Sequence, residues 1–167
     1  MSTTDLDQLI DSCIASRDTR HEDWDTLAFQ AKAGDEYRRA QIRYVGSGGT
    51  GDHENDTRIL PAEHFTFSNM LLPPGAIGPE HTHHDVEEVF FVLEGTLEVS
   101  VHDPEDGSRT ATRHLGYRDL IRVPAGVPRS LRNPGETNAL FCVLLGAKKP
   151  ELPTYPESSP MAGITRD

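Results

Sequence analysis

The stretch from Pro73 to Gly95, PPGAIGPEHTHHDVEEVFFVLEG, constrains the fold more than any other part of the chain. His81 and His83 are two residues apart, so in an extended strand both imidazoles point to the same face of the sheet. The polar residues that follow indicate a turn, after which Glu88 opens a second strand and its carboxylate can return over the two histidines. Two imidazoles and one carboxylate make a candidate ligand set for a divalent transition metal.

These positions resemble the first motif of the cupin superfamily, in which a Gly, a His-x-His pair, a Glu and a second Gly follow at set spacings. Gly75, His81, His83, Glu88 and Gly95 match every defined position. The resemblance implies an all-β fold, a single cupin jelly-roll (double-stranded β-helix) barrel with an N-terminal helical extension. It also implies that the two histidines and the glutamate bind a metal inside the barrel.

A second stretch resembles the second cupin motif, Pro-x-Gly-x-x-His-x-x-x-Asn. Pro124, Gly126 and Asn133 match it, whereas Arg129 stands where the family carries a fourth metal ligand, a His. The resemblance covers roughly residues 40–147. The fold expectation survives this departure, but the site expectation has to be changed.

One interpretation of Arg129 is catalytic. A set of two histidines and one carboxylate leaves coordination positions open, which suits non-haem Fe(II), with Mn, Ni or Zn as other candidates. Arg129, always charged, would then hold the carboxylate or enolate of a small organic acid at the metal. We therefore expect a dioxygenase-like enzyme, an oxidoreductase, whose substrate is a small molecule.

The competing interpretation is electrostatic. A guanidinium repels a nearby dication, and Arg129 can instead form an ion pair with Glu88. The protein would then be a non-catalytic or metal-free cupin that binds a small anion or a sugar acid. Cupins with this motif also include isomerases and lyases, so the resemblance leaves the reaction open.

Strand alternation predicts which residues line the pocket. Phe90 and Val92 share the parity of Glu88, and Leu131 shares the parity of Arg129. A pocket of Phe90, Val92, Arg129 and Leu131 is mostly apolar with one cation, which fits a small aromatic or aliphatic acid. The outward-facing residues of the same strand are also apolar, so we expect a homodimer in which this face is covered.

Composition excludes several classes of protein. A chain of 167 residues suits one domain, and its formal net charge of −11 argues against binding nucleic acid or an anionic membrane. The sequence contains no apolar run of membrane-spanning length, and its first residues are acidic where a signal peptide is basic. Cys13 and Cys142 are far apart and form no CxxC pattern. These features predict a cytoplasmic protein.

We expect three parts: an N-terminal helix and connector over 1–37, the barrel over 38–147, and a Pro-rich tail over 148–167 that wraps the surface or is partly disordered. Apolar alternation predicts strands over residues 38–45, 64–72, 88–95, 96–103, 109–116 and 139–146.

The helix is expected over residues 4–17, and its apolar stripe consists of Leu6, Leu9, Ile10 and Ile14. Two roles stay open for it: an arm that contacts a second subunit, or a helix packed on its own barrel.

Two further features stay open. The Gly-rich segment over 46–55 precedes no helix, so we discount a phosphate-binding loop; it is either a lid over the barrel or a plain connection. His64 would reach the site if its strand face turned inward, but its polar neighbours Thr66 and Ser68 on that face favour solvent.

Overall fold

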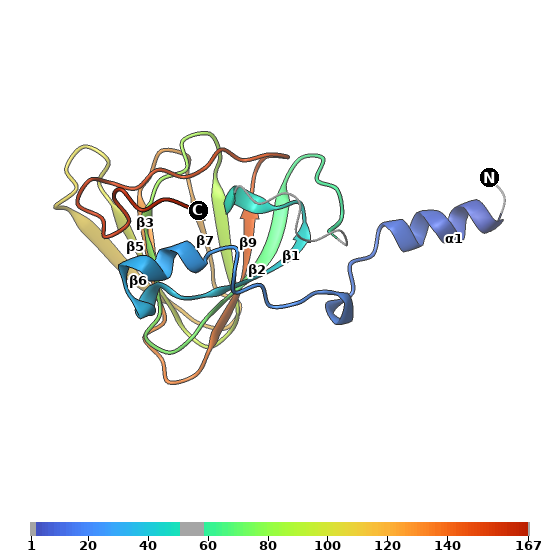
Figure 1. The fold of residues 1–167 in the computed structure, drawn as a ribbon, viewed down its shortest axis with the longest axis horizontal. Coiled ribbons are helices and arrows are strands. Elements are labelled where there is room, and N and C mark those ends of the chain that lie inside the picture. The colour runs from blue at the N-terminus through green and yellow to red at the C-terminus, as the bar shows by residue number, and fades with distance from the viewer. Residues whose placement is uncertain (1–2, 51–58, 167) are drawn as a thin grey trace.

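The computed structural model describes residues 3–50 and 59–166. Residues 51–55 of the Gly-rich segment over 46–55, which the sequence left open as a lid, lie outside the described residues. Within them, the strands form two antiparallel sheets, one with the order β1-β2-β9-β4-β7 and one with the order β3-β8-β5-β6 (Figure 1). The strands are β1 (Ala40–Val45), β2 (Thr66–Leu72), β3 (Ile77–His81), β4 (Glu88–Glu94), β5 (Leu97–His102), β6 (Thr110–Leu115), β7 (Leu120–Val123), β8 (Arg129–Arg132) and β9 (Ala139–Leu145). The two sheets form a jelly-roll barrel, so the predicted all-β fold is confirmed.

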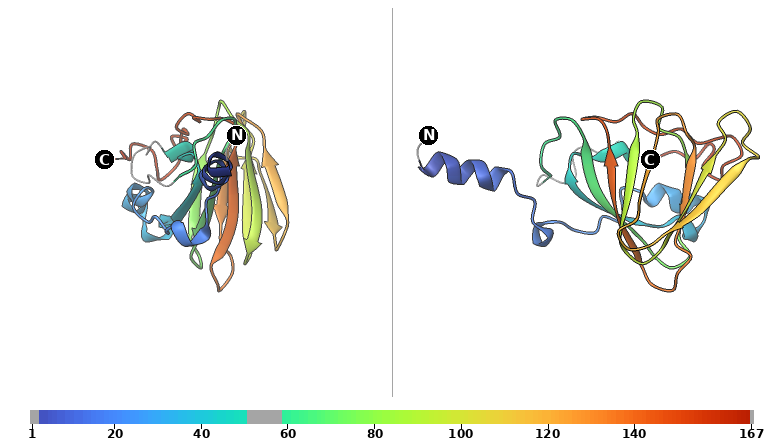
Figure 2. Two further views of the ribbon diagram at one scale, coloured as in Figure 1. Left: turned by 90° about the vertical axis from the view of Figure 1, so that its right-hand side faces the viewer. Right: turned by 180° about the vertical axis from the view of Figure 1, so that it is seen from behind.

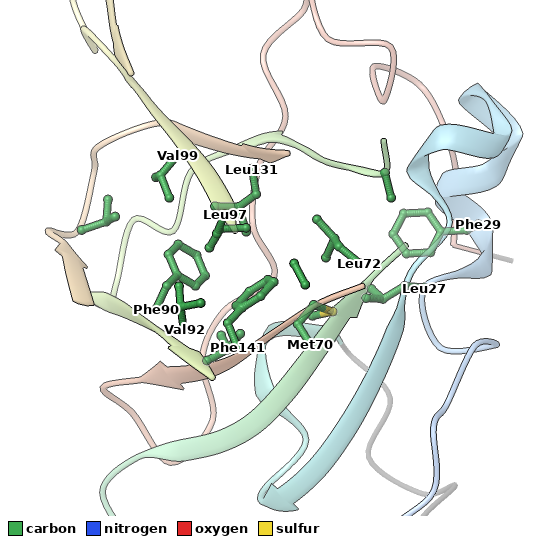
Figure 3. Packing of buried hydrophobic residues seen from close by; sticks show 14 residues of the cluster. Leu27, Phe29, Met70, Leu72, Phe90, Val92, Leu97, Val99, Leu131 and Phe141 are labelled. Carbon is green, nitrogen blue, oxygen red and sulfur yellow. The ribbon is translucent and has the colours of Figure 1, made fainter. Parts of the chain in front are cut away.

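The core lies between the sheets, because strands such as β4 and β9 bury every second residue. Phe90 and Phe141 meet edge to face there, with ring centroids 5.8 Å apart and an interplanar angle of 82°. Figure 3 shows this pair at one end of the apolar cluster and Leu27 and Phe29, from the N-terminal connector, at the other. The connector therefore contributes side chains to the barrel core.

The connector contains short 3-10 helices and is held against the barrel by polar contacts. The helical elements are α1 (Thr3–Ser12), η1 (Arg17–Thr19), η2 (Ala28–Ala33), η3 (Asp35–Tyr37) and, after β1, η4 (Gly48–Thr50). Asp23 bridges to Gln41 of β1 through the backbone, and its carboxylate pairs with buried Arg43. Burial alone would raise the pKa of Asp23, but hydrogen bonds from Thr26 and Asp25 and the charge of Arg43 outweigh it and lower the pKa. This anchor places η2 beside the barrel.

The N-terminal helix differs from the prediction over 4–17. Helix α1 ends at Ser12, whose hydroxyl donates to the Leu9 carbonyl, and it stands clear of the barrel (Figure 1, Figure 2). Its apolar stripe is exposed: the fractions are 50% for Leu6, 49% for Leu9 and 58% for Ile10. Among the described residues, the helix is therefore not packed on its own barrel. The homodimer stays a prediction.

The Pro-rich tail docks on the barrel. Thr154 exchanges backbone hydrogen bonds with Thr82, and its hydroxyl lies 2.7 Å from His84 Nε2. Met161 is almost completely buried. Figure 1 shows the tail running across one end of the barrel. Of the two alternatives for this segment, its path agrees with a tail that wraps the surface.

Among the described residues, no helix combines the length and the apolar character needed to cross a membrane.

The aromatic pair supports a test of the core. Replacing completely buried Phe141 by Ala should lower the free energy of unfolding by about 3–5 kcal/mol, because the change removes the edge-to-face contact with Phe90 and leaves a cavity. Urea denaturation would measure the loss. Leu120→Ala is the control, since Leu120 is 57% exposed and should change stability by less than about 0.5 kcal/mol. An equal effect of both substitutions would contradict this packing.

Candidate metal centre

A cavity of about 60 Å³ lies inside the barrel. Its walls come from both sheets, from the connector through Gln30, from η4 through Gly49 and from the tail through Tyr155. Thr66 and Ser68 of β2 also line it, so the polar face of that strand points inward rather than to solvent. The prediction that this face points to solvent was wrong, because polar side chains can also point inward where they line a cavity. His64 precedes β2 and is exposed, outside the cavity lining.

Three predicted ligands converge in this cavity. His81 ends β3, His83 lies in the following turn, and Glu88 opens β4. One donor atom from each lies within 4.8 Å of the others, and all three residues are buried. His81 Nε2 is 3.9 Å from Glu88 Oε2, and His83 Nε2 is 3.9 Å from Glu88 Oε1. The tight turn between β3 and β4 brings together residues close in sequence.

The protonation of His81 suits a ligand. Its Nδ1 lies 2.8 Å from the Pro79 carbonyl oxygen, so Nδ1 carries the proton and donates it, which leaves the Nε2 lone pair facing the site. Burial, followed by the charge of Arg129 and the nearby His83, lowers the pKa of His81 well below its ordinary value of 6.5. Burial also lowers the pKa of His83, against the opposing charge of Glu88. Neutral imidazoles are the metal-binding form.

Gly49 makes room for His83. A Cβ at position 49 would lie 2.7 Å from His83 Cε1, closer than real contacts allow. The Gly-rich segment, for which the sequence left open a lid or a plain connection, thus places part of η4 directly against a ligand imidazole. Its glycine content was the signal for a loop, but nothing in the local pattern indicated which side chain it would contact.

Arg129 forms a buried ion pair with Glu88. It opens β8 opposite His81 and is completely buried. Its Nε and Nη2 donate to Glu88 Oε2 at 2.8 and 2.5 Å, and its Nη1 donates to the Val127 carbonyl at 3.3 Å. The other carboxylate oxygen, Oε1, accepts neither of these two bonds and faces His83. The contact that the electrostatic interpretation expected is therefore present.

The predicted pocket is only partly brought together. Phe90 and Leu131 line the cavity, whereas Val92 and Arg129 do not. Val92 is completely buried in the apolar core, and Arg129 is paired with Glu88. Strand parity places a side chain on a face, but the depth along the barrel decides whether it reaches the cavity. Arg39, Gln30 and Tyr155 line the cavity and were missed, because their segments lie outside both motifs.

The three donors fit a divalent transition metal. Two neutral imidazole nitrogens and a carboxylate oxygen form a mixed ligand set. Divalent transition metals bind such a set, whereas Mg²⁺ and Ca²⁺ take oxygen ligands. Arg129 balances the charge of Glu88 through Oε2, and Oε1 still faces His83.

Comparisons with known proteins bear on the family of this chain. The family model described as the cupin domain matches residues 68–145. A germin-like protein of Arabidopsis thaliana, subfamily 1 member 7, is 36% identical over 110 residues, which cover 65% of this chain and 48% of that protein. A germin-like protein of Morus alba is 31% identical over 124 residues, covering 65% and 57%. The chain thus spans about half the length of these relatives.

Solved structures share the fold. An oxalate decarboxylase variant of Bacillus subtilis superposes with a TM-score of 0.52 at 25% identity, over 66% of this chain and 26% of that chain. An oxalate oxidase gives 0.60 at 16% identity, over 86% and 63%. Peruvianin-I from Thevetia peruviana latex gives 0.63 at 18% identity, over 87% and 78%.

The jelly-roll barrel with its complete His-His-Glu motif defines a cupin, and the domain match and the relatives agree. The chain belongs to the cupin superfamily. Within the superfamily, the sequence relatives described above are germin-like proteins.

The buried imidazoles predict a pH dependence of stability. Since the pKa of His81 is lowered in the native state, the unfolded chain takes up a proton near pH 6.5 that the native state does not bind. Stability of the metal-free protein should therefore fall as the pH drops from 7.5 to 5.5, by at most about 1.4 kcal/mol per pH unit for this group. Urea denaturation at each pH would measure it. His81→Gln should flatten the slope, whereas exposed His114→Gln should not; equal slopes in all three proteins would contradict the assignment.

The Glu88–Arg129 pair predicts strong coupling. Glu88→Gln alone should cost about 3–5 kcal/mol because it leaves the Arg129 guanidinium buried without a counter-charge, whereas Glu88→Gln/Arg129→Met should recover most of the loss. Glu87→Gln is the matched control, since its partner Arg122 is 58% exposed and that pair should be worth less than about 1 kcal/mol. Denaturation of the wild type, the single variants Glu88→Gln and Arg129→Met, and the double variant gives the cycle. Additive losses at Glu88 and Arg129 would be incompatible with a buried pair.

Proposed function

We propose that this protein is a metal-dependent cupin enzyme that acts on a small organic acid in the barrel cavity, with oxygenase-type chemistry as the first candidate. The observation that carries the proposal is the convergence of three buried donor atoms, from His81, His83 and Glu88, within 4.8 Å of one another at a cavity. Fe(II) is the favoured metal for this ligand set, with Mn, Ni or Zn as alternatives. When bound, the metal would supply Lewis acidity or the activation of dioxygen.

The residues of this chain would prepare the site. The Pro79 carbonyl fixes the tautomer of His81, and burial keeps His81 and His83 neutral. Arg129 holds the Glu88 carboxylate in place from one side. The connector and the tail contribute walls to the cavity, which limits the access of water around the donors.

The relatives support a small acid as substrate class. The structural neighbour from Bacillus subtilis acts, by its name, on oxalate, a small dicarboxylic acid. At 25% identity over 66% of this chain, that likeness supports a class of substrate and not a particular compound.

A second candidate function is a metal-free cupin that binds a small anion without turnover. The ion pair between Arg129 and Glu88 favours it, because two hydrogen bonds already engage one oxygen of the only acidic side chain among the cavity-lining residues described. In this case the histidines would serve as neutral hydrogen-bonding groups for the anion.

Elemental analysis separates the two functions. Protein purified anaerobically without chelator should contain nearly one equivalent of Fe, Mn, Ni or Zn, and His81→Ala/His83→Ala should lose it because two of three donors are gone. Oxygen uptake and product formation would then be followed with a panel of small carboxylic acids. Absence of metal after reconstitution, in a folded protein, would exclude the metalloenzyme and leave the anion-binding function.

A further inference from the structure

Arg39 is a buried cation that the metal site does not use. It immediately precedes β1, is only 6% exposed and lines the cavity. Its Nε has no hydrogen-bond partner, and no acidic side chain among the described residues forms an ion pair with it. An unpaired buried charge is costly, so a ligand that balances it would repay that cost on binding.

The barrel leaves space for this guanidinium beside the metal donors. A Cβ at Gly78 of β3 would lie 2.5 Å from Arg39 Nη1, so a side chain at that position would collide with the guanidinium. The same strand ends at His81. The charge of Arg39 is among the causes that lower the pKa of His81, after burial, Arg129 and His83. Arg39 and the three donors therefore share one cavity.

Two polar side chains from outside the barrel strands complete the surroundings of Arg39. Gln30 of η2 donates from Nε2 to the Tyr155 hydroxyl at 3.3 Å, which leaves the Tyr155 proton free to donate elsewhere. The Tyr155 ring meets the His81 ring edge to face, with centroids 6.4 Å apart. Burial lowers the pKa of Arg39, and Tyr155 and Glu88 oppose that lowering. The connector and the tail thus bring hydrogen-bonding groups to the same region.

The charges in the cavity favour an anion. Arg129 neutralises Glu88, the two histidines are neutral, and Glu88 is the only acidic residue among the described residues of the lining. Glu88 also attracts Arg39, but this single carboxylate cannot balance both Arg39 and Arg129, and a bound divalent ion would add further positive charge. A protein of net charge −11 thus encloses a positively charged cavity.

We propose that Arg39 is the anion-recognition residue of this cavity and binds the carboxylate of a small organic acid whose other end faces His81, His83 and Glu88. A guanidinium offers parallel donors that match the two oxygens of a carboxylate. The cavity of about 60 Å³ is small, so the acid is small. This inference rests on the proposed function for the role of the three donors, and it assigns to Arg39 the anchoring role that the sequence suggested for Arg129.

Binding of small carboxylates to an Arg39→Met variant tests the proposal. The probes are formate, acetate and glycolate, each paired with its neutral amide, and binding is measured by calorimetry and thermal shift on metal-loaded and metal-free protein. At least one carboxylate should stabilise the wild type while its amide does not. Arg39→Met should lower the affinity for that carboxylate about 10- to 100-fold, the equivalent of a lost charge-assisted hydrogen bond. The affinity of Arg39→Lys should lie between those of the wild type and Arg39→Met.

Two controls separate recognition from folding. Arg122→Met removes an exposed arginine outside the cavity and should leave carboxylate binding unchanged. Metal-free Arg39→Met should melt at or above the temperature of the wild type, because the substitution removes an unpaired buried charge, so weaker binding would not reflect unfolding.

The outcomes distinguish this inference from the proposed function. If the wild type holds metal and the Arg39→Met variant binds carboxylates as tightly as the wild type, the inference is overturned and the metal centre stands. If the protein holds no metal but its carboxylate binding depends on Arg39, the inference is supported and the proposed metal-dependent enzyme is excluded. Failure of every carboxylate to stabilise the wild type would also overturn it.

Discussion

The ion pair between Glu88 and Arg129 joins the two sheets of the barrel at the site. Glu88 opens β4 of the five-stranded sheet, and Arg129 opens β8 of the four-stranded sheet. Both are buried, so neither tolerates the loss of the other without an uncompensated charge in the core. The pair therefore aligns the carboxylate with His81 and His83, and it decides that Arg129 does not line the cavity.

Several other buried polar residues line the same cavity as Glu88. Thr66 and Ser68 point inward from β2, and Arg39 and Gln30 lie at the same cavity without full hydrogen bonding. Proteins seldom keep such groups buried, because each unsatisfied group costs stability. Their concentration at one cavity indicates a site selected for binding at the expense of stability, whereas Val92, Leu97 and Val99, outside the cavity lining, pack only in the apolar core.

Segments outside the two motifs shape this site. The connector is tied to β1 by Asp23 and Arg43, and the tail is tied to the turn after β3 by Thr154. Through these anchors, residues far apart in sequence, such as Gln30 and Tyr155, come into hydrogen-bond contact. The motif residues supply the three donors, and the flanking segments supply groups suited to selecting what reaches them.

From the sequence alone, the resemblance to the cupin motifs implied the all-β barrel, and the His-x-His spacing with the short turn before Glu88 indicated the grouping of His81, His83 and Glu88, because both are local properties. The same local rules placed Val92 in the pocket, where depth along the barrel excludes it, and extended the helix beyond Ser12. Only the tertiary structure decided that Arg129 pairs with Glu88 and that Arg39 lines the cavity. Both depend on how two sheets and two flanking segments pack in three dimensions, and neither strand parity nor motif spacing carries that information.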